Sequence, residues 1–108
     1  MISSHILDTH LGRPASNVEV KLFSASGELL AIAKTNSDGR VTAADFGLDQ
    51  IDVAEYSIEF MTQAYFSAQN IPTFFPKAVI YFSVNDAHQH YHIPLLISPY
   101  AYSTYRGS

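Results

Sequence analysis

The sequence predicts an all-β protein, a sandwich or barrel of about seven or eight short strands. Apolar and polar residues alternate along several stretches of the chain, which is typical of strands with one buried face. Turn-forming residues separate these stretches at intervals of about 8 to 12 residues. The 108 residues are 47% hydrophobic and 15% charged, which predicts one globular domain over residues 1–108.

The strand pattern is clearest where Val18, Val20 and Leu22 alternate with charged residues. Residues 28–35 form a weaker run because their alanines favour helix, but turn residues on both sides favour a strand. The strands expected from such patterns cover residues 3–8, 17–23, 28–35, 53–61, 77–85, 90–97 and 100–105.

Two glycine-containing segments are predicted to be hairpin loops. Residues 24–28 lie between two expected strands, and Gly27 can take the positive φ that such loops require. Residues 36–40, with the sequence NSDGR, give a second and stronger turn signal.

One stretch breaks the strand pattern. Residues 62–70 contain good helix formers, and Thr62 is a residue type that caps helix N-termini. Asn70 and then Pro72 end the pattern. We therefore expect one short helix of about two turns in this stretch.

Charge and composition exclude several classes of function. The net charge of −4 and the absence of a basic cluster argue against a nucleic-acid partner. Without cysteine there can be no disulfide or thiolate metal site. No apolar run approaches the roughly 18 residues that span a bilayer, and the first residues lack the pattern of a signal peptide. We expect a cytoplasmic protein, although a processed periplasmic form would look the same.

The chain has five histidines, and three of them lie in the segment HQHYH as His88, His90 and His92. Strand periodicity places His90 and His92 on one face with Pro94 and Leu96, and the apolar residues between them on the core face. An outer face that continues into apolar residues predicts contact with a second subunit. The alternative is an aromatic-rich monomer.

The HQHYH spacing is also compatible with a metal site, since imidazole is a common zinc ligand. The segment lacks a carboxylate or thiolate at a fixed distance, and His88 is expected in a loop. A structural or surface role for His88 and His90 fits the sequence better.

Three further polar residues are candidates for a site. His5 lies in the first expected strand, where a structural role is the alternative, and Arg40 follows Gly39 where it could be a solvated turn cation. Arg106 has no such simple alternative, because the tail around it is neither charged nor linker-like. Its guanidinium could bind a carboxylate or another anion in a bidentate manner.

Three blocks of this sequence together resemble the transthyretin-related 5-hydroxyisourate hydrolases of urate degradation. They are SSHILDTHLGRPA at residues 3–15, TNSDGR at 35–40 and HYHIPLLISPYAYSTYRGS at 90–108. The resemblance covers essentially the whole chain. The final YRGS distinguishes these enzymes from transthyretin, the hormone carrier, which shares the strand pattern and the SPY segment but not this ending.

The resemblance implies a transthyretin-like sandwich of two four-stranded antiparallel sheets with one short helix. It also implies a homotetramer, a dimer of dimers, with its active sites in the channel between subunits. The implied reaction is hydrolysis of 5-hydroxyisourate to 2-oxo-4-hydroxy-4-carboxy-5-ureidoimidazoline, without a metal or organic cofactor.

The resemblance also assigns residues to this reaction. Histidine has a pKa near neutral pH, so either His5 or His92 can take the proton of water, and His92 is favoured. The other histidine orients substrate or protonates the leaving nitrogen, and Arg40 polarises the carbonyl oxygen or holds the flat, anion-prone ring. Ser108 contributes its hydroxyl and, if the chain ends there, a carboxylate. The residues with implied catalytic roles are His5, Arg40, His92 and Ser108. The residues implied to bind substrate are His5, Arg40, Tyr105, Arg106, Gly107 and Ser108.

Two alternatives of other classes remain open from the sequence. One is a transthyretin-like carrier of small aromatic ligands in the same channel. The other is a metal-binding structural protein that uses HQHYH. An intact YRGS together with His5 and His92 favours the enzyme, because a carrier does not need this set of polar groups.

Overall fold

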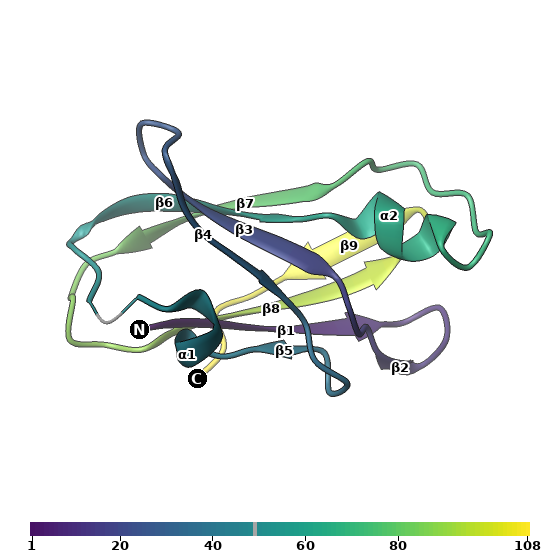
Figure 1. Cartoon of the computed structure of the whole chain (residues 1–108), viewed down its shortest axis with the longest axis horizontal. Coiled ribbons are helices and arrows are strands. Elements are labelled where there is room, and N and C mark those ends of the chain that lie inside the picture. Colours follow the sequence, from purple (N-terminus) through teal and green to yellow (C-terminus); the bar gives the residue numbers. More distant parts are fainter. Residues whose placement is uncertain (49) are drawn as a thin grey trace.

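The computed structural model describes residues 1–48 and 50–108, and these residues form two β-sheets packed face to face (Figure 1). In the part described, one sheet has five strands and the other has four. The first sheet has the order β2 (Arg13–Pro14), β1 (Ile2–Asp8), β8 (Tyr91–Ser98) and β9 (Ala101–Thr104), with β5 (Arg40–Val41) also paired to β1. The second has the order β4 (Leu29–Lys34), β3 (Glu19–Ser24), β6 (Ala54–Phe60) and β7 (Ala78–Val84).

The expected sandwich is confirmed, but one sheet is mixed rather than antiparallel. Strands β1 and β8 run parallel, from the pair Ile2–Tyr91 to the pair Asp8–Ile97. Parallel neighbours need a long crossover connection, and here almost the whole chain supplies it. The two-residue strands β2 and β5 share the other edge of β1, so this sheet has more strands than expected.

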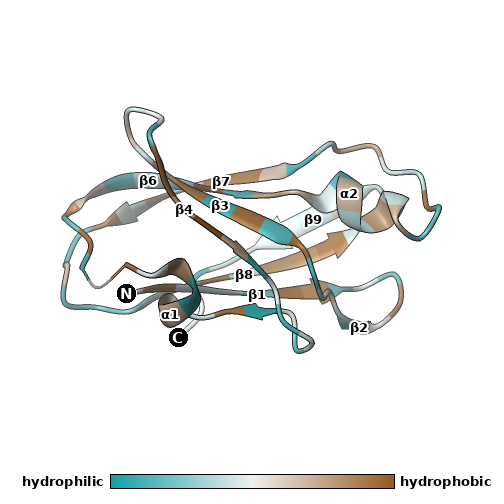
Figure 2. Ribbon diagram, in the orientation of Figure 1, coloured by the Kyte–Doolittle hydropathy of each residue, from teal (hydrophilic) through white to brown (hydrophobic). Residues whose placement is uncertain are grey.

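The predicted alternation of buried and less buried residues holds along β1 and β3. In β6 and β8 three consecutive residues are buried, 56–58 and 93–95, so Pro94, which was expected on the outer face, is buried as well. Ile6 and Leu95 of the first sheet face Leu22 and Ile58 of the second, and all four side chains are fully buried. Burying a side chain of this size stabilises the fold by about 1.5–3 kcal/mol. Figure 2 shows the contrast between β8, which is largely hydrophobic, and its neighbour β9, which is close to neutral.

The two predicted hairpin loops have different outcomes. Residues 24–28 do connect the antiparallel strands β3 and β4, with Gly27 at a φ of 88°. The prediction for residues 36–40 was wrong, because this turn joins β4 of one sheet to β5 of the other. The chain crosses between sheets here because Arg40 pairs with His5 of β1 instead of returning along β4.

Two short helices occur among the described residues. The expected one is α2 (Thr62–Ser67), but its N-cap is Met61 rather than Thr62, which is buried inside the first turn. The backbone N–H of Gln63 donates to the carbonyl of Pro76, so a neighbouring loop replaces the side-chain cap. None of the described helices is both long and apolar enough to cross a membrane.

The second helix, α1 (Ala43–Phe46), was not expected. Thr42 caps it by accepting a hydrogen bond from the N–H of Asp45, whose carboxylate accepts one from the N–H of Thr42. Gly47 ends the helix in the left-handed conformation. This capping box followed by glycine is visible in the sequence, so the signal for the helix was present there.

The turn at Gly39 generates a prediction about stability. Gly39 has a φ of 74°, its carbonyl accepts a 2.7 Å hydrogen bond from the N–H of Ile6, and a Cβ would collide with the carbonyl oxygen of Ile6. Gly12 has a similar φ of 70° but open space around it. We expect Gly12→Ala to lower the free energy of unfolding by about 1 kcal/mol. Gly39→Ala should lower it by a further ~1–3 kcal/mol, measured by urea denaturation. Equal losses would show that the contact with Ile6 does not matter.

Candidate active site

A cavity of about 290 Å³ lies on the outer side of the first sheet, where β1, β5 and β8 meet the end of the chain. Figure 1 shows both chain ends near α1 at this end of the sandwich. The lining of the cavity includes two imidazoles, a guanidinium and several hydroxyl groups. The residues that line it are Ser3, Ser4, Arg40, Val41, Thr42, Ala43, His90, His92 and Ser108. The cavity is therefore polar and contains groups that can accept protons and stabilise negative charge.

Strand pairing brings these residues together from distant parts of the sequence. The parallel register places Ser3 beside His92. On the other edge of β1, His5 is the register partner of Arg40. Because His5 and Ser3 alternate with buried residues along β1, both lie on the outer face. Ser3 lines the cavity, whereas His5 is not among the residues that line it.

His92 is half-buried and is held on two sides. Its ring nitrogen Nδ1 lies 2.7 Å from the hydroxyl oxygen of Ser3. Its main-chain carbonyl accepts a 2.9 Å hydrogen bond from the N–H of Gly107, which brings the tail against the ring. A Cβ on Gly107 would lie 2.6 Å from Cδ2 of His92, so a residue without a side chain is needed at this contact.

The surroundings of His92 favour its neutral form. Burial lowers the pKa of His92 below its ordinary value of 6.5, because a charged imidazole loses water there. The positive charges of Arg40, His5 and His90 lower this pKa further. A neutral ring at pH 7 has a lone pair with which it can accept a proton.

The structure places the remaining predicted site residues differently, and Tyr105 and Arg106 are not among the residues that line this cavity. Ser108 lines it, and Gly107 packs against His92. Arg106 instead places its guanidinium 4.6 Å from the centre of the Tyr91 ring and donates a 3.0 Å hydrogen bond to Oε1 of Gln89. Tyr105 is 59% exposed. Substrate-binding roles for Tyr105 and Arg106 stay predictions.

The structure adds Ser3, His90 and Thr42 to the residues at the cavity. Ser3 and His5 are two residues apart in one strand and therefore share a face, as the sequence predicted for His90 and His92. The pairing of β1 with β8 has no local sequence signal, so the sequence could not show that Ser3 and His90 meet. His88 lies in the loop before β8, as expected.

Within residues 1–48 and 50–108 there is no group of three or more His, Asp or Glu side chains placed to hold a metal ion. Ser3 lies between the imidazoles of His90 and His92, and it forms a 2.6 Å contact with Nε2 of His90. Two residues of the HQHYH segment, His90 and His92, therefore contact the same hydroxyl group.

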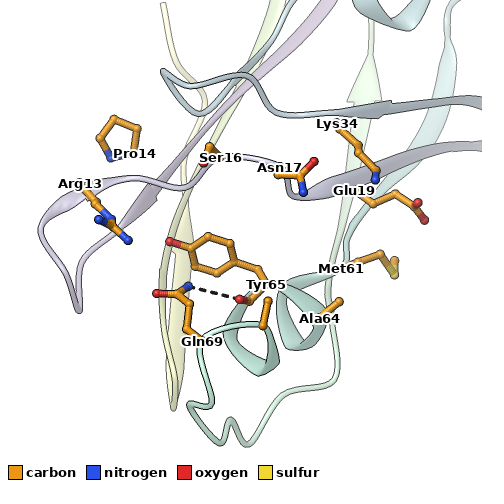
Figure 3. Close-up of a pocket in the computed structure, with 11 residues that line it drawn as sticks. Arg13, Pro14, Ser16, Asn17, Glu19, Lys34, Met61, Ala64, Tyr65 and Gln69 are labelled. Carbon is orange, nitrogen blue, oxygen red and sulfur yellow. Dashed lines mark hydrogen bonds between the residues drawn. The ribbon is translucent and has the colours of Figure 1, made fainter.

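A larger cavity of about 570 Å³ lies on another part of the molecule, between α2, the segment after β2 and the ends of β3 and β4 (Figure 3). Arg13, Lys34 and Glu19 line it together with the side chains of Met61 and Tyr65. This cavity contains no histidine and none of the predicted site residues. We therefore place the candidate active site at the smaller cavity, where a general base is available.

The fold and the site define a class: a β-sandwich protein with a neutral histidine, an arginine and a C-terminal segment around one polar cavity. Residues 2–107 match the model of the HIUase/Transthyretin family, and the chain belongs to this family.

Two relatives match almost the whole chain. A "Probable 5-hydroxyisourate hydrolase" of Schizosaccharomyces pombe is 40% identical over 113 residues, which cover 99% of this chain and 90% of the relative. "5-hydroxyisourate hydrolase 2" of Rhizobium meliloti is 39% identical over 114 residues, which cover 99% of this chain and 95% of the relative.

Solved structures agree with this assignment. The 5-hydroxyisourate hydrolase of Klebsiella pneumoniae superposes with a TM-score of 0.89 at 39% identity, covering 99% of this chain and 98% of that one. Transthyretin from Sparus aurata superposes with a TM-score of 0.84 at 29% identity, covering 98% of this chain and 95% of the transthyretin chain. The backbone is thus shared by hydrolase and transthyretin.

The electrostatics of His92 generate the second prediction. Replacing Arg40 by glutamine removes one positive neighbour, so the pKa of His92 should rise while staying below 6.5 because burial remains. The change can be followed by NMR titration of the imidazole carbon-bound protons. Arg13→Gln is the matched control, since Arg13 lines the other cavity and should leave the titration unchanged. An unchanged midpoint in Arg40→Gln would mean that Arg40 does not act on His92.

Proposed function

We propose that this protein hydrolyses 5-hydroxyisourate to 2-oxo-4-hydroxy-4-carboxy-5-ureidoimidazoline at the cavity around His92. The observation that carries the proposal is the half-buried His92, with a pKa below its ordinary value, on one cavity with Arg40 and Ser108. Membership of the HIUase/Transthyretin family and the hydrolase names of its relatives support this choice of substrate.

His92 acts as the general base. Water is a poor nucleophile at neutral pH, and a positioned base accelerates its attack by about 10²–10⁴-fold. Among the hydrogen bonds of the described residues, those of the His92 ring involve Nδ1 and not Nε2. Nε2 is therefore the atom that takes the proton from water as the hydroxide oxygen bonds to the substrate carbonyl carbon.

The charge that develops on the former carbonyl oxygen is stabilised by Arg40. The guanidinium is a fixed cation with several N–H donors, so it can pair with this developing negative charge. Breakage of the C–N bond leaves a nitrogen that needs a proton. We assign that proton to His5, the register partner of Arg40 on β1.

The C-terminal residues complete the site. Gly107 allows the backbone to approach the ring of His92, and Ser108 brings a hydroxyl group to the cavity. The scheme needs no metal or organic cofactor, because an imidazole supplies the base and a guanidinium supplies the positive charge.

The proposed function predicts catalysis that depends on His92. His92→Ala should lower kcat by about 10²–10⁴-fold, because the base is lost. The measurement is the spectrophotometric decay of freshly generated 5-hydroxyisourate, corrected for spontaneous hydrolysis. His88→Ala is the matched control, since His88 lies in the loop before β8, outside this cavity, and should retain full activity.

Two outcomes would contradict the proposal. If the wild-type protein gave no enhancement over spontaneous decay, the hydrolase function would be rejected and the carrier alternative preferred. If His92→Ala kept nearly full turnover, hydrolysis would stand, but the assignment of His92 as base would fail.

The family also bears on assembly. Membership of the HIUase/Transthyretin family suggests oligomeric assembly, and we propose the homotetramer, a dimer of dimers. Strand β7 lies at one end of its sheet and β9 at one end of the other, and Tyr81 on β7 is 81% exposed. Leu7 and Leu96 add apolar surface next to the candidate site on the outer face of the first sheet. These features support contacts along both the sheet edges and the outer face.

The assembly proposal predicts that a charge on the outer face of the first sheet separates subunits. Leu96→Glu should reduce the mass in sedimentation equilibrium from four chains to two, because the charge would be buried at the contact. Ile32→Glu is the matched control, since Ile32 is an exposed apolar residue on the other sheet and should leave the mass unchanged. A wild-type mass of one chain would overturn the proposal.

A further inference from the structure

We propose that Ser3, with His90 as its hydrogen-bond acceptor, is a positioning residue that holds His92 with its proton on Nδ1 and its Nε2 free. This inference rests on the proposed function, in which Nε2 of His92 is the base. It is carried by two contacts of one hydroxyl group: Ser3 Oγ lies 2.7 Å from Nδ1 of His92 and 2.6 Å from Nε2 of His90.

The number of protons limits how these three groups can be arranged. A serine hydroxyl has one proton to donate, while a neutral imidazole has one N–H and one accepting nitrogen. Ser3 cannot donate to both rings, so at least one ring must donate to Ser3. Between neutral rings, a continuous chain through Ser3 can run in two directions: His92 donates to Ser3 and Ser3 to His90, or the reverse. Both rings can also donate to the two lone pairs of the Ser3 oxygen, and His92 then again carries its proton on Nδ1.

The two arrangements have opposite consequences for His92. When its Nδ1–H donates to Ser3, its Nε2 carries the lone pair and can take a proton from water. In the reverse arrangement Nδ1 accepts from Ser3, the proton sits on Nε2, and the neutral ring has no free acceptor toward substrate. The direction of this short chain therefore decides whether His92 can be a base.

Two features of the site favour the first arrangement. Arg40 lines the same cavity as His92, and a guanidinium has donors but no acceptor, so a lone pair on Nε2 suits the cavity better than an N–H. His90 is exposed, so its other ring nitrogen, Nδ1, can keep its proton hydrogen-bonded to water. His90 is then free to accept from Ser3 at Nε2.

The positions of Ser3 and His90 make this arrangement rigid. Ser3 is fixed in β1 by the parallel pairing with β8, directly opposite His92. His90 precedes β8 by one residue, so its ring reaches the same hydroxyl from the same face. The hydroxyl thus orients the ring of His92 and selects its tautomer without touching the reacting atoms.

The test reads the tautomer directly. Histidine ring nitrogens of ¹⁵N-labelled protein distinguish the Nδ1–H from the Nε2–H form by NMR, at a pH where His92 is neutral. Wild-type His92 should be in the Nδ1–H form. Ser3→Ala should shift it toward the Nε2–H form, which free histidine prefers, whereas Ser3→Thr keeps the hydroxyl and should keep the Nδ1–H form.

A second pair of variants tests whether the accepting atom of His90 matters, rather than the size of its side chain. His90→Gln retains an oxygen that can accept from Ser3, so the Nδ1–H form of His92 should persist. His90→Leu removes the acceptor, which leaves the proton of Ser3 free to point at Nδ1 of His92 and should move the ring proton to Nε2. Circular dichroism and thermal unfolding of each variant confirm that the fold is retained.

Turnover should follow the tautomer. We expect Ser3→Ala and His90→Leu to lower kcat by about 10- to 100-fold with little change in KM, since substrate binding is kept but the base is mispositioned. Ser3→Thr and His90→Gln should recover most of this loss. A structural role alone would not produce recovery that tracks the tautomer.

The outcomes distinguish this inference from the proposed function. A wild-type His92 in the Nε2–H form would overturn the inference whether or not the protein hydrolyses 5-hydroxyisourate. An unchanged tautomer in Ser3→Ala would overturn it as well. The expected tautomers in all variants without hydrolysis in any of them would support the positioning role and reject the hydrolase.

Discussion

The parallel pairing of β1 with β8 is the constraint on which the rest of the molecule depends. It joins the first and the penultimate strand in continuous register, from Ile2 beside Tyr91 to Asp8 beside Ile97. On the inner face this register brings the core residues Ile6 and Leu95 together. On the outer face the same register sets Ser3 beside His92, so one pairing builds both the core and the candidate site.

Two close contacts of the backbone, each at a glycine, complete this arrangement. At Gly39 the backbone passes against the carbonyl oxygen of Ile6, and this turn delivers Arg40 to the edge of β1 beside His5. At Gly107 the tail passes against the ring of His92. A Cβ at Gly39 would collide with the backbone of β1 next to the pairing of Arg40 with His5, and a Cβ at Gly107 would collide with the ring of His92.

Local patterns in the sequence predicted the local structure. Alternation of apolar residues identified the central strands and assigned His92 to the outer face, because period two follows from strand geometry alone. Local patterns failed at residues 36–40, where the turn was recognised but the hairpin was wrong, since a turn does not say which sheet the chain enters next. Helix α1 was missed although Thr42, Asp45 and Gly47 carry its capping signals, because four residues give no periodicity.

By itself the sequence determined the class of fold, the outward-facing histidines and, through its YRGS ending and its other blocks, the resemblance to a family. Tertiary structure alone decided that β1 and β8 are parallel and in which register, because pairing between residues about 90 positions apart is selected by the packing of both sheets. That register puts the hydroxyl of Ser3 between His90 and His92. Local sequence determines which way a side chain points, and only the assembled sheet determines what it meets there.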